Sequence, residues 1–244
     1  MKHPVLRFTA ILVACSLLFA LSVVALSGQM DAVFPSILTE NDLSVKDTGE
    51  IFTVILDAGH GGEDGGAQAN GLTEKDLNLE MTLLLYEVLQ HSGVHVILTR
   101  KTDEMLGDGS PGHKKTEDLR ARLDLANAHP EALLLSIHMN KFPDSSCRGV
   151  QIYYSGNDRR SERMAEILQN KVVQELQPDN RREIKKATSA IYLLDRVKIP
   201  AVLIECGFLS NPLEAALLQD KDYQKELSAL ILSALSDYIG EQQA

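Results

Sequence analysis

Short apolar runs alternate along the chain with longer segments in which apolar residues recur at helical spacing. The short runs are rich in leucine and β-branched residues and have the length of strands that are buried on both faces. They are Ile51 to Leu56, Val94 to Leu98, Leu133 to Ile137, Gly149 to Tyr154 and Ala201 to Ile204. The helical segments are residues 77–89, 118–128, 161–176 and 227–238. This order predicts an α/β fold, a single domain with a mostly parallel twisted sheet of about six strands and helices on both faces.

The first fifty residues do not share this alternation. Phe8 to Leu26 is a stretch of nineteen residues without a charge, close to the ~20 residues that span a bilayer core. Lys2 and Arg7 precede it, which places the N-terminus inside and the rest of the chain outside the membrane. The alternative is a cleaved signal peptide with its cleavage site at Ala25-Leu26-Ser27. We expect a membrane anchor or signal segment at 1–27, a linker at 28–50 and an extracytoplasmic folded domain at 51–244.

The charge balance excludes one class of partner. Thirty-four Asp and Glu oppose twenty-four Lys and Arg, for a net charge of −10. Nucleic-acid binding needs clustered positive charge to meet the phosphates. We therefore expect no nucleic-acid partner, and any anionic polymer must be held by local contacts.

Three ionisable residues stand at the ends of three predicted strands. His60 follows the first run within a loop of five glycines, His138 ends the run at 133–137, and Glu205 ends the run at 201–204. In open parallel sheets, ligands bind outside the carboxyl ends of the strands. The pattern therefore predicts that these three side chains converge at one edge of the sheet.

Two histidines and a carboxylate are a ligand set for catalytic zinc, with water in the fourth position. The third ligand should come from near the glycine loop, where the candidates are Asp57, Glu63, Asp64, Glu74 and Asp76. Glu74 is favoured because it stands at the start of the helix that follows the loop, where its side chain can reach back towards His60. Asp57 is expected to fix the tautomer of His60, and Glu63 and Asp64 are expected to be solvated. Glu205 is then expected to act as general base and later as acid to a leaving amine.

Two other interpretations remain open at this point. The glycine loop could cradle a phosphate, but it lacks the Gly-Lys-Ser/Thr ending of a P-loop, and its two acidic residues repel phosphate. Alternatively, the domain is catalytically inert and binds a polymer or a protein outside the membrane. Of these readings, a zinc hydrolase acting on an amide or ester fits the residues best.

Five ordered segments resemble the zinc-dependent N-acetylmuramoyl-L-alanine amidases of the amidase-3 type. They are LDAGHGGEDGGA, GLTEKDLNLE, the TR…D…LRARLDLAN region, SIHMN and PAVLIECGFLSNPLE. The resemblance implies cleavage of the amide between muramic acid and the first L-alanine of the peptidoglycan stem peptide. It also implies that His60, Glu74 and His138 bind Zn²⁺ and that Glu205 is catalytic.

Within that family the chain is most similar to the CwlD-type spore-cortex amidases, which pair a short membrane segment with one amidase domain. This resemblance implies a role in preparing muramic acid for conversion to muramic δ-lactam. The family often has alanine where Met139 stands here. If the enzyme is regulated, a separate protein partner is expected. Arg120 and Arg122 are candidates for holding a peptide carboxylate; the alternatives are a solvated helix face or a structural salt bridge.

Overall fold

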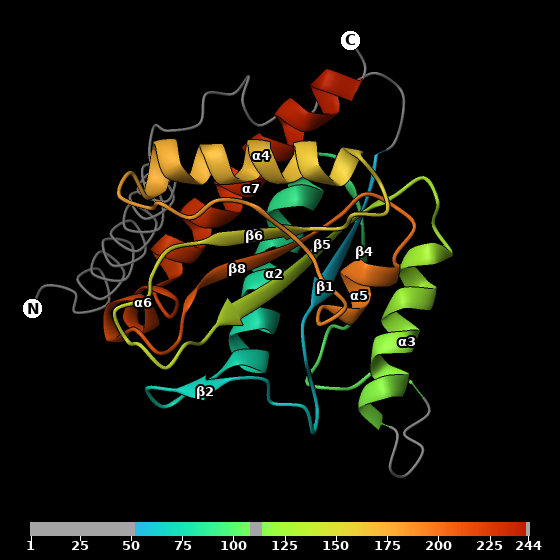
Figure 1. Ribbon diagram of the computed structural model, residues 1–244. Coiled ribbons are helices and arrows are strands. Elements are labelled where there is room, and N and C mark those ends of the chain that lie inside the picture. The colour runs from blue at the N-terminus through green and yellow to red at the C-terminus, as the bar shows by residue number, and fades with distance from the viewer. Residues whose placement is uncertain (1–51, 108–113, 243–244) are drawn as a thin grey trace, which may run out of the picture. The chain divides into compact units, whose positions relative to one another are not determined.

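The computed structural model describes residues 52–107 and 114–242, which form a twisted six-stranded sheet with helices on both faces (Figure 1). The strand order is β4-β1-β5-β8-β6-β7, and only the pairing of β6 with β8 is antiparallel. The strands are β1 (Thr53–Ala58), β4 (His95–Leu98), β5 (Leu133–Asn140), β6 (Gln151–Tyr154), β7 (Lys185–Lys186) and β8 (Ala201–Phe208). The predicted α/β class, the mostly parallel sheet and its number of strands are confirmed.

The three central strands are buried on both faces, as their apolar runs predict. β1 is buried along its whole length, and β5 and β8 are buried at nearly every position. Their register places Leu56 opposite Leu135, and His138 opposite Glu205. Because all three strands run in the same direction, their carboxyl ends meet at one edge of the sheet.

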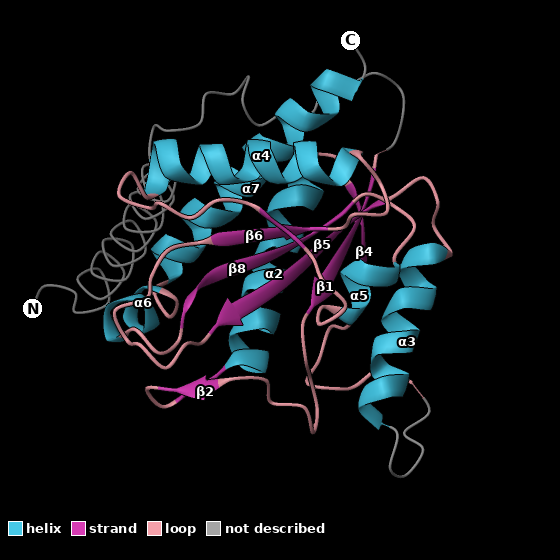
Figure 2. Ribbon diagram, viewed as in Figure 1, coloured by secondary structure: helices cyan, strands magenta, loops and turns pink. Residues whose placement is uncertain are grey.

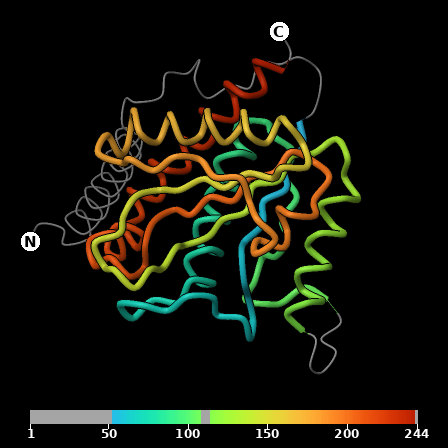
Figure 3. Tube along the Cα trace, viewed as in Figure 1, coloured from blue at the N-terminus to red at the C-terminus, as the bar shows by residue number. Residues whose placement is uncertain are grey.

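The helices divide into two layers, one on each face of the sheet (Figure 2). The larger apolar core joins one face to α2 (Glu74–His91), α4 (Arg160–Lys171) with its extension η1 (Val172–Leu176), and α7 (Lys221–Gln242). α7 packs against both α2 and α4, as the chain trace shows (Figure 3). The smaller core joins the opposite face to α3 (Lys114–Asn127) and α5 (Tyr192–Arg196). The short helix α6 (Pro212–Leu217) follows β8.

Two small elements differ from the sequence expectation. β7 lies within the charged segment 178–186, which is not among the predicted strands. A hairpin of β2 (Gln68–Ala69) and β3 (Leu72–Thr73) precedes α2. Its turn is Asn70-Gly71, and both residues have positive φ, at 51° and 76°, as a tight hairpin turn requires.

None of the helices within 52–107 and 114–242 is long and apolar enough to cross a membrane. The predicted anchor at 1–27 and the linker at 28–50 lie outside the described residues.

Candidate metal centre

Three of the side chains singled out in the sequence meet at the carboxyl edge of the sheet. His60 lies just beyond β1, His138 lies in β5, and Glu74 is the first residue of α2. One donor atom from each lies within 4.8 Å of the other two. The distance from Glu74 Oε1 to His60 Nε2 is 3.2 Å, and to His138 Nδ1 it is 2.9 Å. The two imidazole rings meet edge to face, with their centroids 5.1 Å apart.

The glycine loop folds tightly because two of its glycines leave room for these side chains. A Cβ atom on Gly59 would lie 2.2 Å from His138 Nε2, and one on Gly66 would lie 2.6 Å from Glu74 Oε2. His60 itself has a φ of 62°. A non-glycine residue in this region is strained and persists only where its surroundings hold it, which is common at functional sites.

Asp64 orients His60, which corrects two of the sequence expectations. Its Oδ2 atom accepts a hydrogen bond from His60 Nδ1 at 2.9 Å, so Asp64 is not simply solvated. This bond places a proton on Nδ1, so Nε2 is the ring nitrogen that faces Glu74. Burial alone would raise the pKa of Asp64, but the hydrogen bonds from His60 and Lys115 lower it to about 2. Asp57, which was expected to orient His60, instead turns into the protein interior.

Glu74 is held by backbone donors as well as by the two histidines. Its Oε2 atom accepts from the Ala67 amide at 2.7 Å, and its Oε1 atom accepts from the Met139 amide at 3.3 Å. Burial opposes ionisation, but the hydrogen bonds and charges of His138 and His60 hold the pKa of Glu74 far below its usual range. Glu74 is therefore a buried, ionised carboxylate at neutral pH. The rival candidates Glu63 and Asp76 are exposed.

The interaction between Glu74 and His60 also shifts the pKa of His60, in the opposite direction to that of Glu74. Burial alone would lower the pKa of His60, but the hydrogen bonds and charges of Glu74 and Asp64 raise it. A cation at this site would therefore have to displace a proton that two carboxylates stabilise.

Glu205 lies beside this cluster, on β8 directly opposite His138. Its Oε2 atom is buried and has no hydrogen-bond partner among the described residues. Burial raises the pKa of Glu205 to about 7, and the Glu74 charge adds to this, while His138 and His60 oppose it. A partnerless buried carboxyl is costly for a fold, and a carboxyl with a pKa near neutrality can both accept and release a proton.

A buried ion-pair network lies behind the loop. Asp57 accepts hydrogen bonds from Thr99, Ser136 and Arg122, and Arg122 also pairs with Asp118. The guanidinium of Arg122 further donates to the carbonyls of Ala58 and His60, both at 2.7 Å. Because its side chain is only 2% exposed, the idea that Arg122 holds a peptide carboxylate is wrong and the structural reading is confirmed. Arg120 is exposed.

The residues present fit a zinc ion. Two imidazole nitrogens and one carboxylate oxygen match a catalytic zinc ligand set, which keeps its fourth position open. Ligands of a tetrahedral zinc ion lie roughly 3.3 Å from one another, and both measured separations are close to this. Asp64 supplies the carboxylate that accompanies many metal-binding histidines. Glu205 is not part of this ligand set, and its Oε2 atom has no hydrogen-bond partner among the described residues. Its carboxyl group is therefore available for another role.

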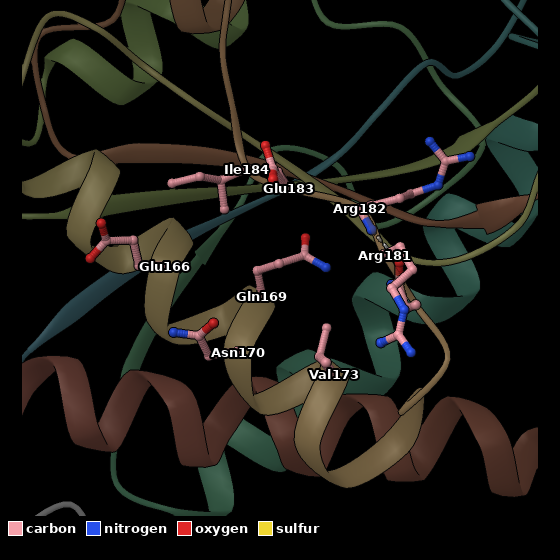
Figure 4. Close-up of a pocket in the computed structure, with 9 residues that line it drawn as sticks. Glu166, Gln169, Asn170, Val173, Arg181, Arg182, Glu183 and Ile184 are labelled. Carbon is pink, nitrogen blue, oxygen red and sulfur yellow. Dashed lines mark hydrogen bonds between the residues drawn. The ribbon is translucent and has the colours of Figure 1, made fainter.

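A separate hollow of about 560 Å³ lies between α4 and the segment that follows η1 (Figure 4). Its lining residues are Glu166, Gln169, Asn170, Val173, Asn180, Arg181, Arg182, Glu183 and Ile184. None of them belongs to the histidine–glutamate cluster, so this hollow is not the candidate metal centre.

Comparisons with known proteins show the family to which the chain is similar. The sequence profile of the N-acetylmuramoyl-L-alanine amidase family matches residues 54–237. A germination-specific N-acetylmuramoyl-L-alanine amidase of Bacillus subtilis (strain 168) is 38% identical over 192 residues, which cover 78% of this chain and 80% of the relative.

Solved structures of related enzymes have the same fold. The CwlD amidase of Clostridioides difficile, solved in complex with the GerS lipoprotein, has a TM-score of 0.74 and 37% identity, and the match covers 78% of this chain and 99% of that one. The catalytic domain of CwlV, an amidase of Bacillus (Paenibacillus) polymyxa var. colistinus, has a TM-score of 0.65 and 28% identity, with 78% and 99% covered. From the length of the profile match and these similarities, this chain belongs to the N-acetylmuramoyl-L-alanine amidase family.

Proposed function

We propose that the chain is a zinc-dependent N-acetylmuramoyl-L-alanine amidase in which His60, Glu74 and His138 hold the metal ion and Glu205 is catalytic. The observation that supports this most directly is the cluster of two imidazoles and one carboxylate beside Glu205, whose buried Oε2 atom has no hydrogen-bond partner in the described part of the chain. A zinc ion on such ligands lowers the pKa of a bound water and polarises a carbonyl oxygen.

The protein's own residues account for the movement of the proton. Glu205 accepts a proton from the attacking water and then gives it to the alanine nitrogen as the amide bond breaks. A pKa of about 7 suits both steps, because the carboxyl group is neither a very weak base nor a very weak acid near neutral pH. Asp64 keeps His60 in one tautomer throughout.

We also propose spore-cortex peptidoglycan as the substrate, the glycan strand with its stem peptide. The similarity to a germination-specific amidase supports this. Removal of the stem peptide would expose the muramic acid for conversion to muramic δ-lactam by a separate deacetylase. The uncharged segment 8–26 supports an extracytoplasmic location, anchored or secreted, such as the forespore intermembrane space.

A regulatory protein partner is a further part of this proposal. The similar CwlD amidase was solved in complex with the GerS lipoprotein, which supports a partner of that kind for this chain. The partner would act outside the membrane, on the same side as the substrate.

The proposed reaction can be tested on purified peptidoglycan. The purified protein is incubated with cortex or vegetative peptidoglycan, with zinc and after its removal by a chelator, and the released fragments are identified by mass spectrometry. We expect free stem peptides that begin with L-alanine, only in the presence of zinc. Binding to peptidoglycan without any release would instead support an inert binding module.

A further inference from the structure

Arg100 is a buried charged residue that has no part in the proposed chemistry. It lies two residues after the end of β4, and it is 2% exposed. Within the described residues its hydrogen bonds all go to backbone carbonyls, namely those of Ala58 at 2.9 Å, Gly59 at 3.1 Å, Lys75 at 2.8 Å and Thr102 at 3.0 Å. Among the described residues Arg100 forms no ion pair, which separates it from Arg122 and its two carboxylates.

Two of these carbonyls belong to the immediate neighbours of candidate metal ligands. Gly59 precedes His60, and Lys75 follows Glu74. A single nitrogen of Arg100, Nη2, donates to both carbonyls. The guanidinium therefore connects the backbone next to His60 to the backbone next to Glu74, although Gly59 and Lys75 are sixteen positions apart in the sequence.

Asn78 makes a parallel connection one turn along α2. Its Nδ2 atom donates to Gly59 O at 3.0 Å and lies 3.4 Å from Glu74 Oε1. The loop is also packed against the arginine, because a Cβ atom on Gly61 would lie 3.1 Å from Arg100 Cδ and Nε. The backbone around His60 is thus held by charged and amide donors, and His60 keeps its strained φ of 62° within this frame.

We propose that Arg100 is a positioning residue of the metal centre, whose guanidinium fixes His60 and Glu74 at the separation at which both can bind one ion. The inference rests on the proposed function in that it takes these two residues as metal ligands. It assigns Arg100 no contact with substrate. Groups that orient metal ligands from behind affect metal affinity by about 10–100-fold when they are replaced.

Metal affinity in two variants of the full-length chain tests this role. Arg100→Met removes all the donors and keeps much of the side-chain volume, whereas Arg100→Lys keeps the charge on one atom that cannot reach four carbonyls. We expect Arg100→Met to bind zinc about 10–100-fold more weakly in a chelator competition, and Arg100→Lys to fall in between. The absorption spectrum of bound cobalt(II) should change in the same order.

The control is Arg163→Met, because Arg163 makes surface ion pairs with Glu166 and Glu241. It should bind zinc as the wild type does. Thermal unfolding of the metal-free proteins shows which variants are folded. If Arg100→Met does not fold, the zinc affinity and cobalt spectrum of Arg100→Lys test the proposal. Wild-type zinc affinity and an unchanged cobalt spectrum in a folded Arg100 variant would overturn the proposal.

Failure of the proposed function gives a different result. If the wild type binds neither zinc nor cobalt, the proposed function is wrong. The effect of Arg100 on the backbone around His60 is then measured in the metal-free protein by hydrogen exchange. The Gly61 amide, which donates to Asp64 O at 3.0 Å, should exchange its hydrogen faster in the folded Arg100 variant than in the wild type. Equal exchange rates would contradict the positioning role.

Discussion

Glu205 has a position and an environment that seldom occur together in a structural residue. It lies in the carboxyl-terminal half of β8 opposite His138, and its Oε2 atom is buried with no hydrogen-bond partner within the described ranges. Desolvation keeps its pKa near 7, so the group is poised to exchange a proton at neutral pH. Burial of a carboxyl oxygen without a partner lowers the stability of the fold, and a role in the reaction explains why the protein keeps it.

This role can be separated from metal binding by the variant Glu205→Gln. The amide has the same shape but cannot accept the proton of the attacking water, so the release of stem peptides should fall by about 10²–10⁴-fold. Zinc content should stay at the wild-type level because Glu205 is not among the proposed ligands. Both quantities are measured on the same preparation, by elemental analysis and by mass spectrometry of the digest. A fully active Glu205→Gln enzyme would exclude the general-base role.

At the scale of single residues, the sequence identified side chains whose position follows from topology alone. His60, His138 and Glu205 stand at the ends of apolar runs, and parallel strands bring such ends together. Asp64 was among the candidate carboxylates, but its hydrogen bond to His60 was missed, because the sequence does not show the left-handed backbone conformation that His60 has in this loop. The spacing of an acid four residues after a histidine in a loop was the available signal. The assigned roles of the four site residues stay predictions.

At the scale of elements, one ion-pair network joins β1 and β5 to α3. Asp57 is its centre, with hydrogen bonds from Ser136 and Arg122. Burial alone would raise the pKa of Asp57, but the charge of Arg122, the Ser136 hydrogen bond and the charge of His138 lower it. Because the folded-state pKa is lowered, the ionised carboxylate stabilises the fold above its unfolded pKa of about 3.9. That stabilisation is lost as the pH falls through the folded-state pKa.

The variant Asp57→Asn should therefore lose stability in a pH-dependent way. Breaking a buried pair at neutral pH is expected to lower the free energy of unfolding by about 3 kcal/mol. The difference from the wild type should shrink as the pH falls below about 4, because the Asp57 carboxylate is then protonated in the unfolded wild-type chain and, at still lower pH, in the folded chain as well. Urea unfolding across this pH range measures it. Arg163→Met, which breaks exposed pairs, should cost no more than about 1 kcal/mol, and an equal loss in both variants would contradict this account.

The sequence predicted the long elements and missed the short ones for a physical reason. Strands such as β5 are recognised by a continuous apolar run, and helices such as α2 by apolar residues at helical spacing, because both bury a large apolar surface. β7 is a pair of exposed lysines and depends on its neighbour β6 for its conformation. The β2–β3 hairpin did have a local signal, Asn70-Gly71, which is a strong indicator of a tight turn. α3 begins at Lys114, four positions before the predicted start.

At the scale of the described domain, the faces of the sheet and its carboxyl edge have different roles. Its two faces are covered by helices and form the apolar cores, while the carboxyl edge of β1, β5 and β8 gathers the ionisable residues. Large-scale architecture of this kind follows from the alternation of strands and helices. The relation of this domain to a membrane remains a prediction, since the segment 1–27 lies outside the described residues.

The central claim is that three side chains distant in sequence bind one zinc ion, and zinc content measures this directly. We expect about one zinc ion per chain in the wild type, and loss of both zinc and peptide release in His60→Ala, Glu74→Ala and His138→Ala. The control His129→Ala alters a partly exposed histidine whose one ion pair within the described residues is with Glu131, so it should retain both. Full zinc content in any of the three ligand variants, or full peptide release by the wild type after complete removal of zinc, would contradict the account.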